Sequence, residues 1–196
     1  MISAPSPPAS GNSTPTVSCD ITLRGRVQGV GFRPFVYRLA QDLALCGSVR
    51  NRMGEVTIAV EGGEGAVEQF RQQLLSAAPP LSRPEIHTVD LRPLRHFSAF
   101  VIEESSQEER GAIHLPPDHN LCPLCRHDLD DRDNRRYHYP FTNCTQCGPR
   151  YTIIEALPYD RAATSMAPFP LCPDCLQEYR NPGDRRFHAE PIACPR

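Results

Sequence analysis

The chain has 196 residues, which is enough for one medium-sized domain or two small ones. Its 21 basic and 23 acidic side chains nearly balance, which gives no whole-chain argument for binding nucleic acid or an anionic membrane surface. No apolar run approaches the roughly 20 residues that a bilayer-spanning helix needs, so the sequence predicts no membrane span.

The N-terminal segment 1–17 is rich in Pro, Ser and Thr, and it lacks the basic start and apolar core of a signal peptide. We interpret it as a disordered leader. The chain has nine cysteines, most of them in evenly spaced CxxC pairs. Without a signal peptide, this pattern favours metal-bound thiolates in a reducing cytoplasm over disulfides. Cys19 and Cys46 lie outside the paired array and are expected to be free thiols.

Segment 18–106 has the pattern of a small α+β domain. Period-two alternation predicts its strands, and an apolar stripe of period 3.6 predicts its helices. The expected strands are 19–25, 48–52, 55–61, 85–91 and 97–102, and the expected helices are 33–45 and 64–77. The order βαββαβ is that of the split-βαβ, ferredoxin-like sandwich.

A glycine-bearing turn at 26–32 joins the first expected strand to the first expected helix. Gly29 and Gly31 would let the backbone approach an anion, and the following helix would aim its free N–H groups there. Arg33 adds a fork of charged donors. The glycines alone are explained equally well by a plain tight turn, because strand-to-helix connections often need glycine.

The string LRGRVQGVGFR at residues 23–33 resembles the phosphate-cradle signature of acylphosphatases. Their second signature is matched by Gly47, Val49, Arg50, Asn51, Gly54, Val56 and Gly62. The sequence departs from it at Ser48, where the family has an aromatic residue, and in a turn after Asn51 that is one residue short.

This resemblance implies a role for each matching residue. The phosphoryl oxygens would be held by Arg33 and by the backbone amides of Gln28, Gly29, Val30, Gly31 and Phe32. Asn51 would orient the attacking water through its side-chain amide, with no nucleophilic side chain and no metal in the reaction. Taken alone, Asn51 can also be interpreted as a turn residue that caps its own backbone.

Segment 107–117 is polar and is interpreted as a linker to a duplicated region, 118–196. A shift of 50 residues places Cys122 on Cys172, Cys125 on Cys175, Cys144 on Cys194, and the RRYH string 135–138 on RRFH 185–188. In the first copy, 18 residues separate two CxxC pairs, a spacing that suits one four-thiolate zinc site. Acidic residues interleaved with the arginines favour intramolecular salt bridges over nucleic-acid binding.

The predicted ligands of the first site are Cys122, Cys125, Cys144 and Cys147, and those of the second are Cys172, Cys175 and Cys194. The counterpart of Cys147 would fall one residue past Arg196, so we interpret the sequence as a fragment of a longer protein. His188 or water would complete the second tetrahedron. Because a four-thiolate site leaves no open position for water or substrate, the predicted zinc is structural.

Taken together, residues 19–196 resemble the N-terminal part of the HypF family, the carbamoyltransferases of nickel–iron hydrogenase maturation. The resemblance implies carbamoyl phosphate as the substrate and a HypE-type protein as a partner. It also implies downstream YrdC-like and carbamoyltransferase domains, which these residues do not contain.

Two functions are consistent with the sequence. The first is enzymatic: the acylphosphatase-like domain would cleave carbamoyl phosphate to carbamate and phosphate. The second is a non-catalytic zinc-binding docking module with a vestigial acylphosphatase fold.

Overall fold

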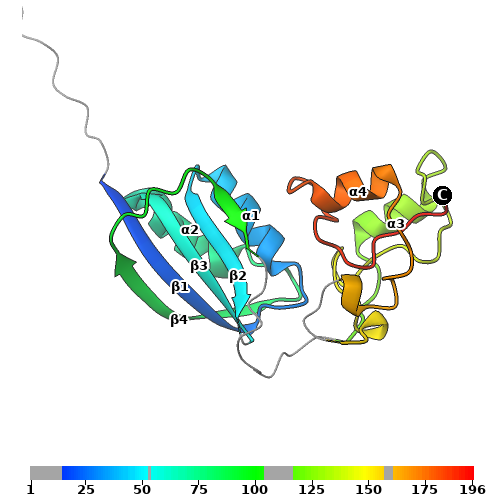
Figure 1. Cartoon of the computed structure of the whole chain (residues 1–196), viewed down its shortest axis with the longest axis horizontal. Helices are drawn as coiled ribbons and strands as arrows, with labels where there is room; N and C mark the ends of the chain where they lie inside the picture. The colour runs from blue at the N-terminus through cyan, green and yellow to red at the C-terminus, as the bar shows by residue number, and fades with distance from the viewer. Residues whose placement is uncertain (1–14, 53, 104–116, 157–160) are drawn as a thin grey trace, which may run out of the picture.

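The computed structural model describes residues 15–52, 54–103, 117–156 and 161–196 (Figure 1). Almost all of the predicted leader and linker therefore lies outside the described residues. The first strand begins at Thr16, so it includes two residues that the sequence assigned to the leader. Within the described ranges, no helix is both long and apolar enough to cross a bilayer.

The N-terminal half is a five-stranded sheet with two helices, as predicted. Its elements are β1 (Thr16–Arg26), α1 (Phe32–Asp42), β2 (Cys46–Arg52), β3 (Glu55–Gly63), α2 (Glu64–Ser76), β4 (Arg83–Arg92) and β5 (Phe100–Ile102). The strands lie side by side in the order β4-β1-β3-β2-β5. The first four strands pair antiparallel, which is the split-βαβ arrangement, and β5 joins β2 in parallel at the edge.

The core of this half lies between the sheet and its two helices. Alternate side chains of β1, at Cys19, Ile21 and Leu23, are buried and pack in one cluster with Val36 of α1 and Phe70 of α2. The period-two pattern of the strand and the 3.6-residue pattern of the helices thus meet in one apolar layer. This layer fixes where the loop between β1 and α1 leaves the sheet.

Helix α1 ends at Asp42, three residues before the predicted end. Ala44 takes a positive φ of 51°, and the Leu45 amide donates a hydrogen bond to the Ala40 carbonyl, so the backbone has left the helical conformation before residue 45. Gly47 lies within β2 with a φ of 144°. A Cβ there would sit 1.9 Å from the Ala59 carbonyl oxygen, so this glycine permits the close approach of β2 and β3.

Strand β5 begins at Phe100 rather than at residue 97. The reason is a side chain from β3. The carboxylate of Glu61, which is 6% exposed, accepts hydrogen bonds from the backbone amides of Arg95, His96 and Phe97 at 3.2–3.3 Å. These amides bond to Glu61, so the chain joins the sheet edge only after them.

The C-terminal half has little regular structure. It contains α3 (Pro123–Asp130), the short 3-10 helices η1 (Tyr151–Ile153) and η2 (Arg161–Ala163), and α4 (Pro173–Arg180). Apart from Phe187, its buried apolar side chains among the described residues gather in two small groups around the cysteines. Below, the first repeat means residues 122–147 and the second repeat means residues 172–196.

The duplication read from the sequence is also a structural one. Cys122 and Cys172 cap α3 and α4, and each Sγ accepts a hydrogen bond from the backbone amide three residues on, at 3.4 Å. His138 and His188 both have a positive φ, of 53° and 51°. The backbone amide of each bonds to a carbonyl near the end of its repeat's helix.

The two halves touch through α1 and the loop before it. The ring centroids of Tyr37 and Phe187 are 6.0 Å apart. A Cβ on Gly31 would lie 3.6 Å from the backbone oxygen of Gln146 in the first repeat. Figure 1 shows α1 on the side of the sheet domain that faces the cysteine-rich half.

Candidate functional site

The predicted phosphate cradle, Gln28–Phe32, connects the end of β1 to the start of α1. Gly29 and Gly31 have φ values of 66° and 71°, a region that glycine enters without steric cost. Val30 and Phe32 are buried and hold the loop against the core. No side chain caps α1 at Gly31, so the positive end of the helix faces the loop, as an anion site requires.

The loop is fastened to the β2–β3 hairpin, which carries Asn51. The Gln28 side-chain amide donates a 2.9 Å hydrogen bond to the Glu55 carbonyl at the start of β3. Val56, the next residue, pairs with Leu23 of β1 on one side and with Asn51 of β2 on the other. The structure therefore brings the predicted cradle and Asn51 to the same end of the sheet.

Asn51 has an unsatisfied polar atom. Its Oδ1 is buried and has no hydrogen-bond partner among the described residues. A buried amide oxygen normally has a partner, and an unpartnered one calls for an explanation such as strain, a catalytic role or an ordered water. Arg33, the predicted phosphate ligand, is the second residue of α1 and so follows the cradle directly.

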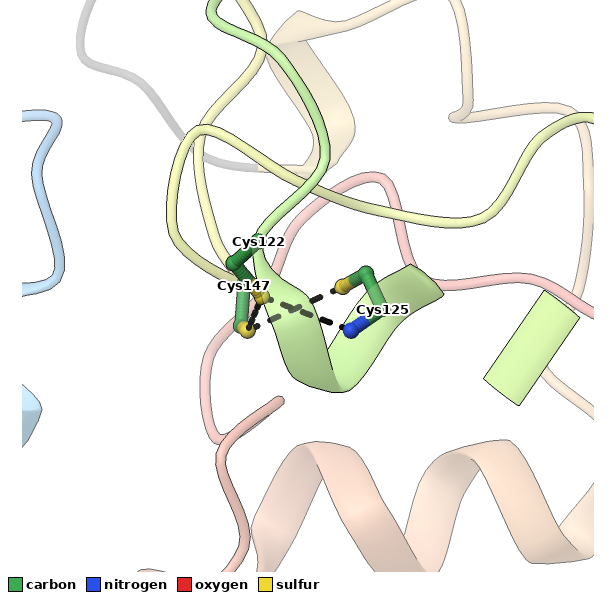
Figure 2. A group of neighbouring side chains, drawn as sticks. All are labelled: Cys122, Cys125 and Cys147. Carbon is green, nitrogen blue, oxygen red and sulfur yellow. Dashed lines mark hydrogen bonds between the residues drawn. The ribbon is translucent and has the colours of Figure 1, made fainter. Parts of the chain in front are cut away.

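In the first repeat, Cys122, Cys125 and Cys147 form a group whose sulfurs all lie within 4.8 Å of one another (Figure 2). The Sγ atom of Cys147 lies 3.6 Å from that of Cys122 and 3.8 Å from that of Cys125. Zn–S bonds of ~2.3 Å in a tetrahedron place sulfurs about 3.8 Å apart, so the three sulfurs already have the spacing of zinc ligands.

Cys144, the fourth predicted ligand, lies beside this group but is not one of its three members. Its Sγ accepts a 3.0 Å hydrogen bond from the Cys122 amide, and the Cys125 thiol donates to the Asn143 carbonyl at 2.6 Å. The hydrogen bond with Cys125, together with burial, raises the pKa of the Cys144 thiol to about 12. Cys144 would have to lose its thiol proton to bind a metal.

The second repeat brings Cys172, Cys175 and Cys194 together, with the sulfurs of Cys172 and Cys194 3.5 Å apart. A hydrogen bond from the Cys175 amide lowers the pKa of Cys172 to about 7, while burial raises the pKa of Cys175 to about 11. His188 is not a member of this group, and its ring lies 5.2 Å from that of Tyr179.

Some features of the cysteine region were not found from the sequence. The paired arginines form the expected intramolecular salt bridges, but they also donate hydrogen bonds to cysteine sulfurs of the opposite repeat.

Asn143 is 1% exposed, and neither polar atom of its side chain has a hydrogen-bond partner among the described residues. In the sequence, this buried polar position is indicated only by the 50-residue shift, which aligns Asn143 with the apolar Ala193.

Comparisons with known proteins divide the chain at the same point. The acylphosphatase family matches residues 19–102, and the HypF finger family matches residues 121–154 and 171–196. Carbamoyltransferase HypF2 of Cupriavidus necator is 51% identical over 160 residues, which cover 80% of this chain and 20% of that protein. Carbamoyltransferase HypF of Rhodobacter capsulatus is 45% identical over 175 residues, covering 89% of this chain and 23% of that protein.

Among solved structures, full-length HypF in a phosphate- and nucleotide-bound form superposes with a TM-score of 0.85 at 42% identity. The superposition covers 95% of this chain and 25% of that one. The chain thus spans about a fifth to a quarter of the length of the relatives that it matches.

Proposed function

Since this chain belongs to the HypF family, as an acylphosphatase domain followed by the HypF finger region, we propose that its first domain hydrolyses carbamoyl phosphate. Water attacks phosphorus, the bond from phosphorus to the carbamoyl oxygen breaks, and carbamate leaves with that electron pair. The water's protons pass to the phosphate formed and to solvent. Because carbamate is a good leaving group, the domain needs to supply only positioning and charge stabilisation.

In this proposal, Arg33 and the amides of Gln28–Phe32 hold the phosphoryl oxygens. Their donors neutralise the charge that builds on those oxygens in the transition state. Asn51 holds the attacking water through its carboxamide. The observation that carries the proposal is the buried Asn51 oxygen, which has no hydrogen-bond partner among the described residues and lies at the end of the sheet where Gln28 ties the cradle to the hairpin. The solved full-length HypF is in a phosphate- and nucleotide-bound form, so phosphate is a ligand of that relative.

The test is phosphate release by the whole 196-residue chain, measured with carbamoyl phosphate and with benzoyl phosphate and without added metal. Arg33→Ala and Asn51→Ala should each lower turnover by roughly 100-fold or more, as for loss of a preorganised donor. Arg92→Ala, on the partly exposed β4 arginine, is the matched control and should leave turnover unchanged. Turnover that survives both Arg33→Ala and Asn51→Ala refutes the assignment, and no turnover in the unaltered chain favours the docking-module alternative.

We also propose that the cysteine groups hold structural zinc. Thiolates are suitable ligands, and the measured sulfur separations match the edges of a zinc–sulfur tetrahedron. Cys144 supplies the fourth thiolate of the first repeat, and Cys172, Cys175 and Cys194 supply three in the second. Lobes with such small cores depend on the metal for folding free energy. Reduced thiolates fit the cytoplasmic location that the sequence predicts.

The wider role proposed for the chain follows from its relatives. Carbamate made at the cradle would be used by YrdC-like and carbamoyltransferase domains, and the carbamoyl group would pass to a HypE-type partner. A phosphate-release assay on the present chain tests only the first step. Carbamoyl transfer must be measured on a protein of the relatives' full length.

A further inference from the structure

The two cysteine repeats exchange arginine side chains. Arg185, in the second repeat, donates hydrogen bonds from one guanidinium nitrogen to the sulfurs of Cys125 and Cys147 in the first, at 3.0 and 3.1 Å. In the reverse direction, Arg135 of the first repeat donates to both sulfurs of the second repeat's CxxC pair, at 3.6 and 3.2 Å. Each cysteine group therefore receives a charged donor from the other repeat.

Two carboxylates hold these arginines in place, and they too are 50 residues apart. Asp128 of the first repeat accepts hydrogen bonds from the arginine pair 185–186. Glu178 of the second repeat pairs with the arginines 135–136, with closest distances of 2.8 and 2.7 Å. The crossed contacts thus have the same form in both directions.

Two of these arginines are buried, so their contacts are not solvent-exposed surface salt bridges. Arg136 and Arg186 are 2% and 4% exposed. Arg136 also bonds through Nε to the Ala193 carbonyl at 2.8 Å and through a terminal nitrogen to the Cys175 sulfur at 3.3 Å. A buried guanidinium that loses its partner is strongly destabilising, so each repeat depends on the other for its charged partners.

We propose that the arginines of each repeat are outer partners of the other repeat's metal site, so that the two sites bind zinc as a coupled pair. This rests on the zinc assignment proposed above. Around Zn²⁺, the four thiolates of the first site leave a net charge of about −2 and the three of the second leave about −1. A guanidinium hydrogen-bonded to sulfur offsets this negative charge. Removing such outer partners typically costs 10- to 100-fold in metal affinity. Arg135 and Arg185 are positioning residues here, because neither binds the metal.

The alternative is that the arginines only fasten the repeats together through Asp128 and Glu178. The two explanations differ in where a substitution acts. An outer partner changes the electronic environment of one site, the one in the opposite repeat. A fastening contact leaves the spectrum of a loaded site unchanged, or disturbs both sites together.

The experiment uses the whole chain loaded with ¹¹³Cd, whose NMR resonance reports the sulfur environment of each site separately. Cys122→Ser and Cys172→Ser assign the two resonances. Arg185→Gln should move the resonance of the first site and speed its metal loss to a competing chelator by roughly 10- to 100-fold. Arg135→Gln should do the same to the second site. Arg132→Gln, at an exposed arginine of the first repeat, is the matched control and should change neither.

Arg185→Lys covers the case in which Arg185→Gln does not fold, because it keeps the charge but loses the planar fork. It should still move the resonance of the first site. Disabling the second site with Cys172→Ser and Cys175→Ser should also weaken metal binding at the first, since coupling is reciprocal.

Opposite results overturn the proposal. If each arginine variant perturbs the site of its own repeat, both sites equally, or neither, the crossed coupling is wrong while the zinc assignment stands. If the unaltered chain binds neither Cd²⁺ nor Zn²⁺, both proposals fail.

Discussion

Tyr37 of α1 and Phe187 of the second repeat face each other with ring centroids 6.0 Å apart and planes inclined at 51°. Phe187 is 8% exposed, so the contact is largely shielded from water. Tyr37 lies on the same helix whose first turn follows the phosphate cradle. The pair therefore joins the sheet domain to the cysteine-rich half within one helix of the proposed site.

A double-mutant cycle should measure this contact. Tyr37→Ala and Phe187→Ala are each expected to destabilise the chain, with a coupling of about 0.5–1.5 kcal/mol between them, as for other aromatic pairs. Denaturant unfolding of the two single variants and the double variant gives the coupling. A cycle that closes with purely additive effects would show that the rings do not stabilise one another. A second cycle with Tyr37→Ala and Phe100→Ala gives the coupling of a comparable pair within the sheet domain, whose ring centroids are 6.3 Å apart.

Arg33 and Asn51 should differ in what they do to phosphate binding. Asn51→Ala is expected to lower kcat by roughly 100- to 1000-fold while inhibition by inorganic phosphate stays nearly unchanged, because its carboxamide holds water. Arg33→Ala is expected to weaken phosphate inhibition as well, because its guanidinium holds the product's oxygens. Steady-state kinetics with phosphate as a competitive inhibitor distinguishes the two roles. Equal weakening of phosphate inhibition in both variants contradicts the separate roles.

A glycine pair tests the backbone of the cradle. Gly31→Ala forces an L-residue into a φ near 71°, which costs about 1–2 kcal/mol, and it also brings a methyl group to 3.6 Å from the Gln146 oxygen. We expect lower stability and weaker phosphate binding, measured by thermal unfolding and by calorimetric titration with phosphate. Gly65→Ala is the control, because an added Cβ in helix α2 meets nothing within 4 Å. Because Gly65 lies in the first turn of α2, that change should stabilise the chain by less than the roughly 0.5–1 kcal/mol of a helix interior, and it should leave phosphate binding unchanged.

Cysteine alkylation should follow burial and metal binding. Cys19 is 2% exposed, and burial raises the pKa of its thiol, so less of the reactive thiolate is present at any given pH. In the zinc-loaded chain, iodoacetamide should label the half-buried Cys46 first and Cys19 only after unfolding. A chelator should then expose the seven cysteines of the two repeats. Peptide mass spectrometry follows each position, and rapid labelling of these seven before chelation argues against bound metal.

The parts of the structure that follow from local patterns were predictable from the sequence. The order of strands and helices, the glycine turn before α1 and the 50-residue duplication all depend on residues close together in the chain or on a regular offset. The early end of α1 and the late start of β5 were not predictable in this way. Strand β5 starts late because Glu61, on a strand formed some 35 residues earlier, accepts its hydrogen bonds from Arg95–Phe97.

The candidate sites show the same division. Motif spacing pointed to Cys122, Cys125 and Cys147, whose sulfurs lie together, but it did not reveal that the Cys144 sulfur accepts a hydrogen bond from the Cys122 amide. The repeated arginines were correctly expected to form salt bridges. Each arginine crosses to the opposite repeat because of the tertiary structure. No sequence pattern within one repeat indicates which sulfur its arginine will contact.

The crossed contacts also have the symmetry of a two-fold dimer contained in one chain. By the 50-residue offset, Glu178 is the counterpart of Asp128, and Arg185 is the counterpart of Arg135. Asp128 pairs with Arg185, and its counterpart Glu178 pairs with Arg135, so the same contact is made in both directions. In an isologous interface residue i meets j, and j meets i. The ion-pair partner of each of these positions thus lies in the other repeat. Across homologues, position 128 should co-vary with 185 and position 178 with 135, whereas 128 should vary independently of 135.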